Sequence, residues 1–342
     1  MRVVSVVGNR PQFVKSAPLS IALRKAGIDE VAVHTGQHWD RALSQVFFDE
    51  LAIPEPAYRL DLRTADPGSM EPAIRDVIGR ERPDWVLVYG DTNSTLAGAR
   101  AAGDTPVAHV EAGLRSFDLG MPEERNRIEV DRLAALLLCP DDRSAAQLAH
   151  EGVAGRREVV GDVMRDALDL FAPLSERSDE PFPDEYAVLT LHRAANTEPD
   201  RLRRIVPALG STGWTFVFPV HPRTRHVLDV HAIPLPPNVQ MVEPLGYLEM
   251  LALVRGSARV LTDSGGLQKE AYWLRIPCIT LRPGTEWVET VETGANTLVD
   301  PDDDVALDGL GATLERARFP EGAPTLYGDG RAAERVAAAL YA

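Results

Sequence analysis

Short apolar runs alternate with helical stretches along nearly the whole of this 342-residue chain. The first half carries RVVSVV, EVAVHT, DWVLVYG, PVAHV and ALLLCP, and the second carries YAVLTLHR, TFVFPVHP, VQMVEPL, ARVLTDSGG and PCITL. Between such runs lie segments like PQFVKSAPLSIALRKAG, which has proline near its start and Gly27 at its end, as a helix would. The alternation is typical of βαβ units and predicts an α/β protein with parallel sheets.

A change in composition divides these runs into two series. After VVGDVMRDALDLFAP comes the polar, proline-bearing SERSDEPFPDE, and a new series opens with YAVLTLHR. A single α/β core stops growing well before this length. The sequence therefore predicts one domain over 1–168, a second over 169–327, and an alanine-rich helix within 328–342.

Composition excludes several classes of partner. The formal charge of −15 argues against a nucleic-acid or anionic-membrane surface, although one local anion site remains compatible with it. Cys139 and Cys278 lie in apolar runs and are expected to be buried free thiols, and no HExxH-like or CxxC-like spacing indicates a metal. The start MRVVSVVGNR lacks the apolar length of a secretory signal or membrane span, so we expect a soluble cytoplasmic protein.

Acidic residues close two successive strand signals. Asp91 follows VLVYG, Glu111 follows VAHV, and a third acid, Glu123, comes soon after in PEERNR. The first polar residue after a buried parallel strand lies at the carboxyl edge of the sheet, where α/β proteins bind ligands. The sequence therefore predicts an enzyme in which these acids do chemistry.

The run VLTDSGGLQKEA combines a strand, a polar cap, two glycines and a helix start. A capped turn without a ligand would account for this pattern about equally well. The adjacent Gly265 and Gly266 after Ser264 favour a phosphate, because glycines let the backbone approach a ligand and a helix start attracts an anion. Glu270, one turn into the helix, is placed to accept hydrogen bonds from ribose hydroxyls.

The first strand ends in GNRPQFVK, where Arg10 and Lys15 are expected to bind an anion at the carboxyl edge. In GQHWD, Gln37 and His38 line the same site or merely satisfy a loop, and the sequence leaves both readings open.

Histidines follow two strand signals of the second half. His192 comes after VLTL and His221 comes after FVFPV, each with arginines nearby. A single histidine after a strand is more often a structural hydrogen-bonding group than a catalyst, so position alone does not decide their role.

A series of short motifs runs through essentially the whole chain, in the order GNRPQFVK, HTGQH, GDTNSTLAG, HVEAGLR, PEERNR, GDVM, LHRAAN, VHPRTR, EPLGYLEML, DSGGLQKEA and TEWVE. In these motifs and in their order, the chain resembles the non-hydrolysing UDP-N-acetylglucosamine 2-epimerases. The resemblance implies a GT-B-like fold with two Rossmann-like domains facing across a cleft that holds the active site. It also implies that the carboxyl-terminal helix returns to the first domain and that the protein is a homodimer without a cofactor.

The resemblance also implies residue roles. The catalytic positions of the family match Asp91, Glu111, Glu123 and His192. The positions implied to bind UDP or the rest of the substrate are Arg10, Lys15, Arg127, His221, Ser264, Gly265, Gly266 and Glu270. Gln37 and His38 match positions that border a second, regulatory UDP-N-acetylglucosamine site in the bacterial enzymes.

The implied reaction interconverts UDP-N-acetylglucosamine and UDP-N-acetylmannosamine by eliminating UDP to a 2-acetamidoglucal and adding it back. The chain departs from the family at Ala195, where many relatives keep a carboxylate, at Lys269, and at Trp287, where many have arginine. These departures leave the exact sugar open, and a modified UDP-sugar such as a 2,3-diacetamido uronate is the alternative substrate. The sequence also leaves open a hydrolysing 2-epimerase, a GT-B glycosyltransferase and a non-catalytic nucleotide-sugar sensor, although the three acids argue against a transferase.

Overall fold

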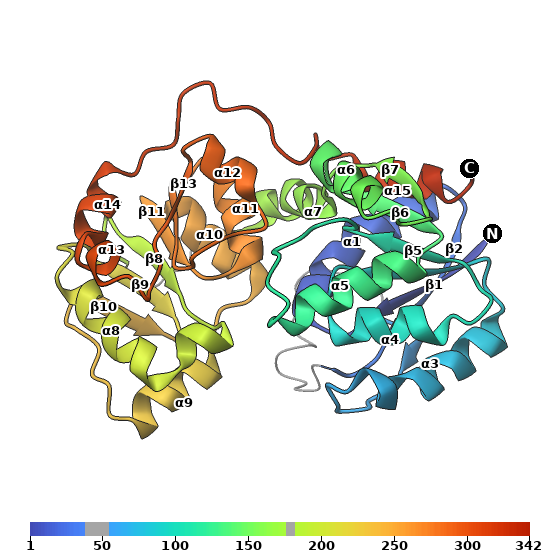
Figure 1. Ribbon diagram of the computed structural model, residues 1–342, viewed down its shortest axis with the longest axis horizontal. Helices are drawn as coiled ribbons and strands as arrows, with labels where there is room; N and C mark the ends of the chain where they lie inside the picture. The colour runs from blue at the N-terminus through green and yellow to red at the C-terminus, as the bar shows by residue number, and fades with distance from the viewer. Residues whose placement is uncertain (38–54, 176–181) are drawn as a thin grey trace. The chain divides into compact units, whose positions relative to one another are not determined.

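The computed structural model describes residues 1–37, 55–175 and 182–342. They form two compact units (Figure 1): Met1–Phe171 with Tyr327–Ala342, called the first unit, and Ala172–Leu326, called the second unit. The boundary that the sequence suggests between 168 and 169 falls inside a helix, α7, which continues to Phe171. Every strand run named from the sequence forms a strand, so the predicted alternation is confirmed.

The first unit is built on a parallel sheet in the order β3-β2-β1-β4-β5-β6-β7. Its strands are β1 (Arg2–Val7), β2 (Asp29–His34), β3 (Tyr58–Arg59), β4 (Trp85–Tyr89), β5 (Val107–Val110), β6 (Leu136–Cys139) and β7 (Arg156–Val159). Its described helices are α1 (Arg10–Lys25), α3 (Pro67–Glu81), α4 (Asn93–Ala101), α5 (Pro122–Leu133), α6 (Asp142–His150), α7 (Val163–Phe171) and α15 (Ala332–Ala339). Helices α3, α4 and α5 pack in sequence, and α1, α7 and α15 form another group.

The second unit is a parallel sheet in the order β10-β9-β8-β11-β12-β13. Its strands are β8 (Ala187–Thr190), β9 (Phe216–Pro219), β10 (Val239–Val242), β11 (Arg259–Thr262), β12 (Cys278–Thr280) and β13 (Asn296–Leu298). Its helical segments are η1 (Ala172–Leu174), η2 (Ala194–Thr197), α8 (Pro199–Gly210), α9 (Pro222–Val230), α10 (Tyr247–Gly256), α11 (Gly265–Trp273), α12 (Val288–Glu292), α13 (Asp304–Asp308) and α14 (Leu310–Arg316).

The last helix belongs to the first unit, as predicted. Helix α15 packs against α1 and α7. Its first backbone amides, those of Ala332 and Ala333, donate to the Asp166 carboxylate of α7 at 3.0 and 2.9 Å. Burial raises the pKa of Asp166, and these amide donors oppose that shift. The end of the chain is thus fixed by a carboxylate at a helix N-terminus, where negative charge is favourable.

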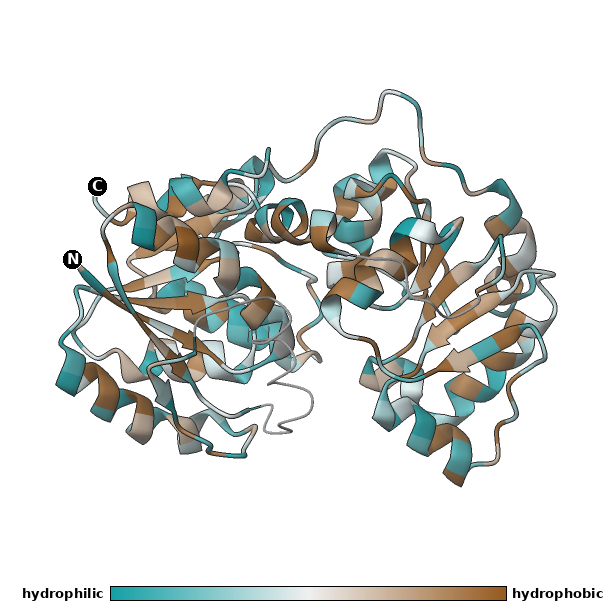
Figure 2. Cartoon of the chain, turned by 180° about the vertical axis from the view of Figure 1, so that it is seen from behind, coloured by the Kyte–Doolittle hydropathy of each residue, from teal (hydrophilic) through white to brown (hydrophobic). Residues whose placement is uncertain are grey.

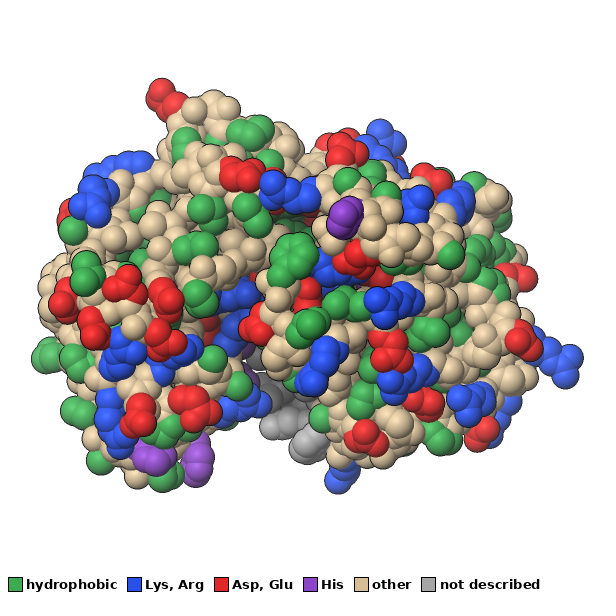
Figure 3. Space-filling model, viewed as in Figure 1, with side chains coloured by type: hydrophobic (Ala, Val, Ile, Leu, Met, Phe, Trp, Pro, Cys, Tyr) green, Lys and Arg blue, Asp and Glu red, His purple; other side chains and the backbone are tan. Residues whose placement is uncertain are grey.

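The strands supply the cores of both units. They are drawn largely in the hydrophobic colour in Figure 2, and the residues of β4, β5 and β6 are almost completely buried. Both Cys139 and Cys278 are buried free thiols, as expected. Acidic and basic side chains are interspersed over the face shown in Figure 3. In the described part of the chain, no helix combines the length and apolar character needed to cross a membrane.

In both sheets the strand order reverses beside the first strand of the unit. The reversal lies between β1 and β4 in the first unit and between β8 and β11 in the second. Connections leave such neighbouring strands toward opposite faces, which opens a crevice at the carboxyl edge where doubly wound proteins bind ligands. The loops after β1, β4, β8 and β11 are therefore the places to look for a site.

Candidate active site

The loops after β1 and β4 are tied together by buried hydrogen bonds. The Gln12 side chain accepts from the Gly8 amide at 2.7 Å and donates to the Tyr89 carbonyl at 2.9 Å. A Cβ on Gly8 would lie 2.0 Å from the Ser94 hydroxyl and 2.4 Å from that of Thr35, so only glycine fits. The switch point of the first sheet is thus a rigid, closely packed turn.

Two predicted residues converge at this turn. The ammonium of Lys15, on α1, forms an ion pair with the carboxylate of Glu111, which follows β5, and both side chains are mostly buried. Gly90 lies beneath them, since a Cβ there would be 3.1 Å from the Glu111 carboxylate and 3.4 Å from the Lys15 ammonium. Glu111 has a φ of 72°, a left-handed conformation that is costly for a residue with a side chain. Such strain is characteristic of functional positions.

Asp91 pairs with a second buried cation. Its carboxylate contacts the guanidinium of Arg127, a residue of α5 that is 5% exposed. The same guanidinium lies 2.5 Å from the carboxylate of Glu124, which is 1% exposed and also accepts from the Ser116 and Phe117 amides at 2.9 and 3.0 Å. The Arg127 guanidinium therefore links the Asp91 carboxylate, which follows β4, to the Glu124 carboxylate of α5.

Glu123, the third predicted acid, lies in the first turn of α5 and is exposed. Its neighbour Glu124 is the carboxylate that enters the buried network. The predicted acid and the buried one therefore share a turn of helix, but the pattern PEERNR did not indicate that Glu124 is the enclosed carboxylate of the pair.

A buried histidine ties together the three elements that carry these acids. The ring of His109, in β5, lies 2.7 Å from the Gly90 carbonyl through Nε2 and 2.7 Å from the Asp131 carboxylate of α5 through Nδ1. Asp131 also accepts from Arg115 at 2.7 Å, and His109 and Asp131 are fully buried. Gly90 immediately precedes Asp91, so this chain of contacts fixes the end of β4 against α5.

Two other predicted residues of the first unit, Arg10 and Gln37, lie near the same turn. Arg10 is the first residue of α1. The Gln37 side chain accepts from the amide and hydroxyl of Ser94, at the start of α4, at 3.0 and 2.7 Å. His38 lies outside the described residues.

In the second unit, His192 and Asp263 meet at the switch point. His192 follows β8 and Asp263 follows β11. The His192 ring lies 3.0 Å from the Asp263 carboxylate, which also accepts from the His192 and Arg193 amides at 3.0 Å each. Burial works against the charge of Asp263, but the hydrogen bond and charge of His192 and the backbone amides outweigh it and lower the pKa of Asp263.

The predicted phosphate turn begins directly after Asp263. Ser264 caps α11 by accepting from the Leu267 amide at 3.4 Å, and Gly265 and Gly266 open the helix. A Cβ on Gly265 would lie 2.5 Å from the Glu286 carboxylate, so this glycine makes room for a charged neighbour.

Two arginines lie close to the Glu286 carboxylate and offset its charge. The Glu286 carboxylate lies 2.8 Å from the Arg282 guanidinium and 3.5 Å from that of Arg193. Burial, partly offset by Glu286, lowers the pKa of Arg282. The start of α11 thus combines free amide donors, a helix dipole and arginines, which are the features of an anion site.

Glu270 points into the second unit near α10 and is 7% exposed. Burial first, and then the charge of Glu270 and its hydrogen bond, raise the pKa of Tyr247 well above its ordinary range. Two of the departures noted in the sequence, Lys269 and Trp287, touch each other: the Lys269 ammonium lies 3.8 Å from the centre of the Trp287 ring.

His221 caps a helix in this structure. Its Nδ1 accepts from the Arg223 amide at 3.2 Å at the start of α9, and the residue is exposed. A structural role for this histidine, which the sequence left open, therefore has a concrete basis beside the predicted binding role.

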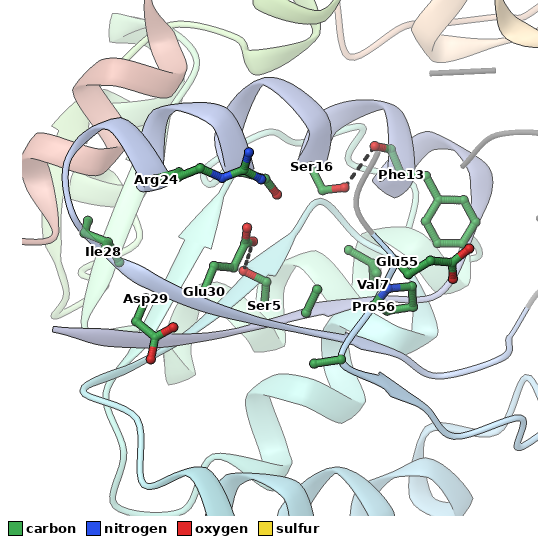
Figure 4. A pocket seen from close by; sticks show the side chains of 13 residues that line it. Ser5, Val7, Phe13, Ser16, Arg24, Ile28, Asp29, Glu30, Glu55 and Pro56 are labelled. Atoms are coloured by element: carbon green, nitrogen blue, oxygen red, sulfur yellow. Dashed lines mark hydrogen bonds between the residues drawn. The ribbon is translucent and has the colours of Figure 1, made fainter. Parts of the chain in front are cut away.

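A cavity of about 270 Å³ lies elsewhere in the first unit, between α1 and the strands β1 and β2 (Figure 4). Glu30 projects into it and accepts from the Ser5 hydroxyl at 2.6 Å. Residues predicted for the active site do not line this cavity. Across the described ranges, there is no cluster of three or more histidine, cysteine or acidic side chains that could hold a metal.

Sequence reasoning missed four ionisable residues that the structure places in contact with the predicted ones or with their loops: His109, Glu124, Asp131 and Asp263. Two of them left a usable signal. His109 interrupts an otherwise apolar strand two residues before Glu111, and Asp263 directly follows a buried strand, as Asp91 nearly does. Glu124 and Asp131 lie inside a polar helix pattern and carry no such mark.

Comparison with known proteins shows a consistent relationship over the full chain. A family model described as UDP-N-acetylglucosamine 2-epimerase matches residues 21–341. The chain is 44% identical to a UDP-2,3-diacetamido-2,3-dideoxy-D-glucuronate 2-epimerase of Pseudomonas aeruginosa, with 98% of each chain covered. It is 37% identical to a UDP-N-acetylglucosamine 2-epimerase of Methanocaldococcus jannaschii, again with 98% of each covered.

Solved structures extend this similarity to the fold. A crystal structure of the Methanocaldococcus jannaschii UDP-GlcNAc 2-epimerase in complex with UDP-GlcNAc and UDP superimposes with a TM-score of 0.92 at 36% identity, covering 100% of this chain and 99% of that one. The spinosyn rhamnosyltransferase SpnG, with a TM-score of 0.54 at 18% identity, shares the fold alone. The GT-B-like fold class predicted from the sequence is confirmed.

Proposed function

The chain belongs to the UDP-N-acetylglucosamine 2-epimerase family and is a UDP-sugar 2-epimerase, and from that premise we propose that it interconverts UDP-N-acetylglucosamine and UDP-N-acetylmannosamine. The observation that carries this proposal is the pairing of strand-end carboxylates with buried cations in the first unit, together with an anion-binding helix start in the second. The first feature suits proton transfer, and the second suits a diphosphate.

The reaction must break a bond before the hydrogen can move. The hydrogen on C2 of the sugar has no neighbouring carbonyl, so a carboxylate cannot remove it directly. When the C1–O bond breaks, its electron pair leaves with the UDP oxygen, and the positive character that develops at C1 acidifies the hydrogen on C2. A carboxylate takes that proton, and the products are UDP and a 2-acetamidoglucal with a C1–C2 double bond.

The return path inverts C2. A proton is delivered to the opposite face of C2, and the UDP oxygen adds again to C1. This needs a proton acceptor and a proton donor, and we assign those tasks to Asp91 and Glu111, with Glu123 in a supporting role. The contacts of Asp91 with Arg127 and of Glu111 with Lys15 support the assignment, because each carboxylate is held in one place by an ion pair.

The second unit is proposed to bind UDP. The amides at Gly265 and Gly266 and the Ser264 hydroxyl would meet the diphosphate, and Glu270 would accept from the ribose hydroxyls. His192 and Arg193 follow the neighbouring strand and would stabilise the charge that develops on the departing diphosphate oxygen.

A specific observation favours a second candidate substrate. The identity of 44% with the UDP-2,3-diacetamido-glucuronate 2-epimerase exceeds the 37% with the UDP-N-acetylglucosamine 2-epimerase quoted above. Ala195 and Trp287, which depart from the resemblance, are both in the second unit. The second candidate is therefore the same 2-epimerisation of a 2,3-diacetamido uronate.

One experiment tests both. The protein is incubated with each UDP-sugar in deuterated water, and C2 is followed by NMR. Deuterium at C2 together with interconversion of the gluco and manno forms is the expected result for the true substrate. Free sugar and UDP as the main products would instead indicate hydrolysis, and turnover only after addition of an acceptor would indicate a glycosyltransferase.

A further inference from the structure

A buried carboxylate holds the ring of His192 in the second unit. Asp263 is 0% exposed, and its Oδ1 lies 3.0 Å from Nδ1 of His192. We propose that Asp263 is a positioning residue: it holds a proton on Nδ1 of the His192 ring, so that Nε2 is the nitrogen left to exchange a proton with the substrate. The proposal rests on the function proposed above and extends it to a residue that has no assigned role.

The hydrogen bonds to Asp263 fix the direction of this contact. Asp263 accepts hydrogen bonds from the backbone amides of His192 and Arg193 and from the Asn196 side-chain amide, the last at 3.2 Å. Three such donors favour an ionised carboxylate, and an ionised carboxylate only accepts. The ring nitrogen that faces it must therefore donate, so Nδ1 carries hydrogen.

This arrangement gives His192 a defined chemical role. With Nδ1–H directed at Asp263, Nε2 is the ring nitrogen that can take up a proton, and once protonated it is a donor. The His192 side chain is 42% exposed, so the ring remains accessible to a ligand. A donor at this position can stabilise the charge that builds on the departing diphosphate oxygen.

The position in the fold supports the same role. Asp263 bridges the loops after β8 and β11, at the reversal of strand order, and is followed at once by Ser264, the cap of α11. The other charged groups packed around this edge are Arg193, Glu286 and Arg282, which form a separate ion-paired group. Asp263 is the carboxylate within reach of the His192 ring among the described residues.

A purely structural explanation is that Asp263 serves only to satisfy the two backbone amides. The variant Asp263→Asn separates the two roles. Its side-chain oxygen can still accept from the amides, which turns the new NH2 group toward Nδ1. The ring must then accept at Nδ1, and its proton moves to Nε2.

The experiment uses the full-length protein labelled with ¹⁵N-histidine. The chain has 8 histidines, and the His192 signals are identified by their loss in His192→Gln. The expected result is the Nδ1–H tautomer in the neutral wild type and the Nε2–H tautomer in Asp263→Asn. We expect kcat of that variant to fall by roughly 100-fold or more, the usual contribution of a positioned acid or donor, with a much smaller change in Kd for UDP.

Asn196→Ala is the matched control, because it removes another donor to Asp263 without touching the His192 ring. It should lower thermal stability while leaving the tautomer and kcat unchanged. An Nε2–H tautomer in the wild type would overturn the proposal even if Asp263→Asn did not fold, and so would an unchanged kcat in a folded Asp263→Asn. The tautomer is measured without substrate, so this test is independent of the proposed function. If the protein shows the expected tautomers but turns over neither UDP-sugar, the proposed function is contradicted and the positioning of His192 by Asp263 still stands.

Discussion

Removing the guanidinium of Arg127 should destabilise the first unit, because two carboxylates depend on it. In Arg127→Met the helix keeps a side chain of similar length, but Asp91 and Glu124 lose their shared cation. The two carboxylates are then left close together without the charge that separates them. Leaving a buried charge uncompensated is among the costlier single changes in a protein.

The magnitude follows from the burial of each partner. Breaking a buried ion pair by removing one side costs about 3–5 kcal/mol. Asp91 is 29% exposed and can regain water, and Glu124 keeps its hydrogen bonds from Ser116 and Phe117. We therefore expect a loss near the lower limit, about 3 kcal/mol. For a domain of this size that corresponds to a fall in Tm of roughly 6–12 °C.

Urea unfolding of the full chain, monitored by circular dichroism, measures the effect. The set comprises Arg127→Met, Glu124→Gln and the double variant, and Arg125→Met serves as control because Arg125 is exposed on the same helix. The double variant should recover about 1–2 kcal/mol of the summed losses, since the fully buried Glu124 charge is gone and only the partly exposed Asp91 lacks its cation. A loss below about 1 kcal/mol in Arg127→Met, or strictly additive losses, would show that this ion pair does not organise the site.

Three further variants test the site and its surroundings. Asp91→Asn should slow deuterium entry at C2 by roughly 100-fold or more while UDP binding persists, and exchange at the wild-type rate would refute its role as a proton-transfer group. Gly8→Ala places a Cβ 2.0 Å from the buried Ser94 hydroxyl and should lower the free energy of unfolding in urea by about 2 kcal/mol or more. In the control Gly79→Ala, the new Cβ meets no atom within 4 Å and should not destabilise the protein. Equal stability of the two variants would contradict the packing argument. Burial raises the pKa of Glu30, so ionisation of this carboxyl destabilises the fold increasingly as pH rises above its pKa in the unfolded chain, about 4.3. Glu30→Gln should therefore be more stable than wild type at pH 7 and lose that advantage toward pH 4. The opposite trend in the unfolding midpoints would contradict the effect of burial on Glu30.

The strands that the sequence revealed are those buried on both faces. Runs such as VLVY and LLLC are apolar throughout because helices cover both sides of the sheet. The strands that went unnoticed are short or polar and lie at sheet edges: β7 reads RREV and is largely exposed, β3 has 2 residues and β13 has 3. Edge strands do not need a continuous apolar run, so composition gives no signal for them.

The candidate site, like the strands, has features that the sequence predicts and features that it does not. Positions at strand ends could be predicted, because the carboxyl edge of a parallel sheet follows from strand order along the chain. Partners could not be predicted, since the contacts Asp91–Arg127 and Lys15–Glu111 join residues far apart in sequence. Which cation faces which acid is decided by the packing of α1 and α5 against the sheet, and that packing has no counterpart in local sequence pattern.

These pairings also explain how a chain with a formal charge of −15 can be suited to an anionic substrate. The excess of acid is spread over the surface, where water and salt screen it, whereas the carboxylates at the first switch point are each matched by a buried cation. In the second unit Arg193 is 26% exposed and lies 3.5 Å from Glu286, a longer contact than the 2.8 Å between Arg282 and Glu286. Arg193 is thus the cation best able to turn toward a diphosphate without leaving Glu286 uncompensated, because Arg282 continues to pair with it. Local compensation of this kind, rather than net charge, determines whether an anion can bind at this edge.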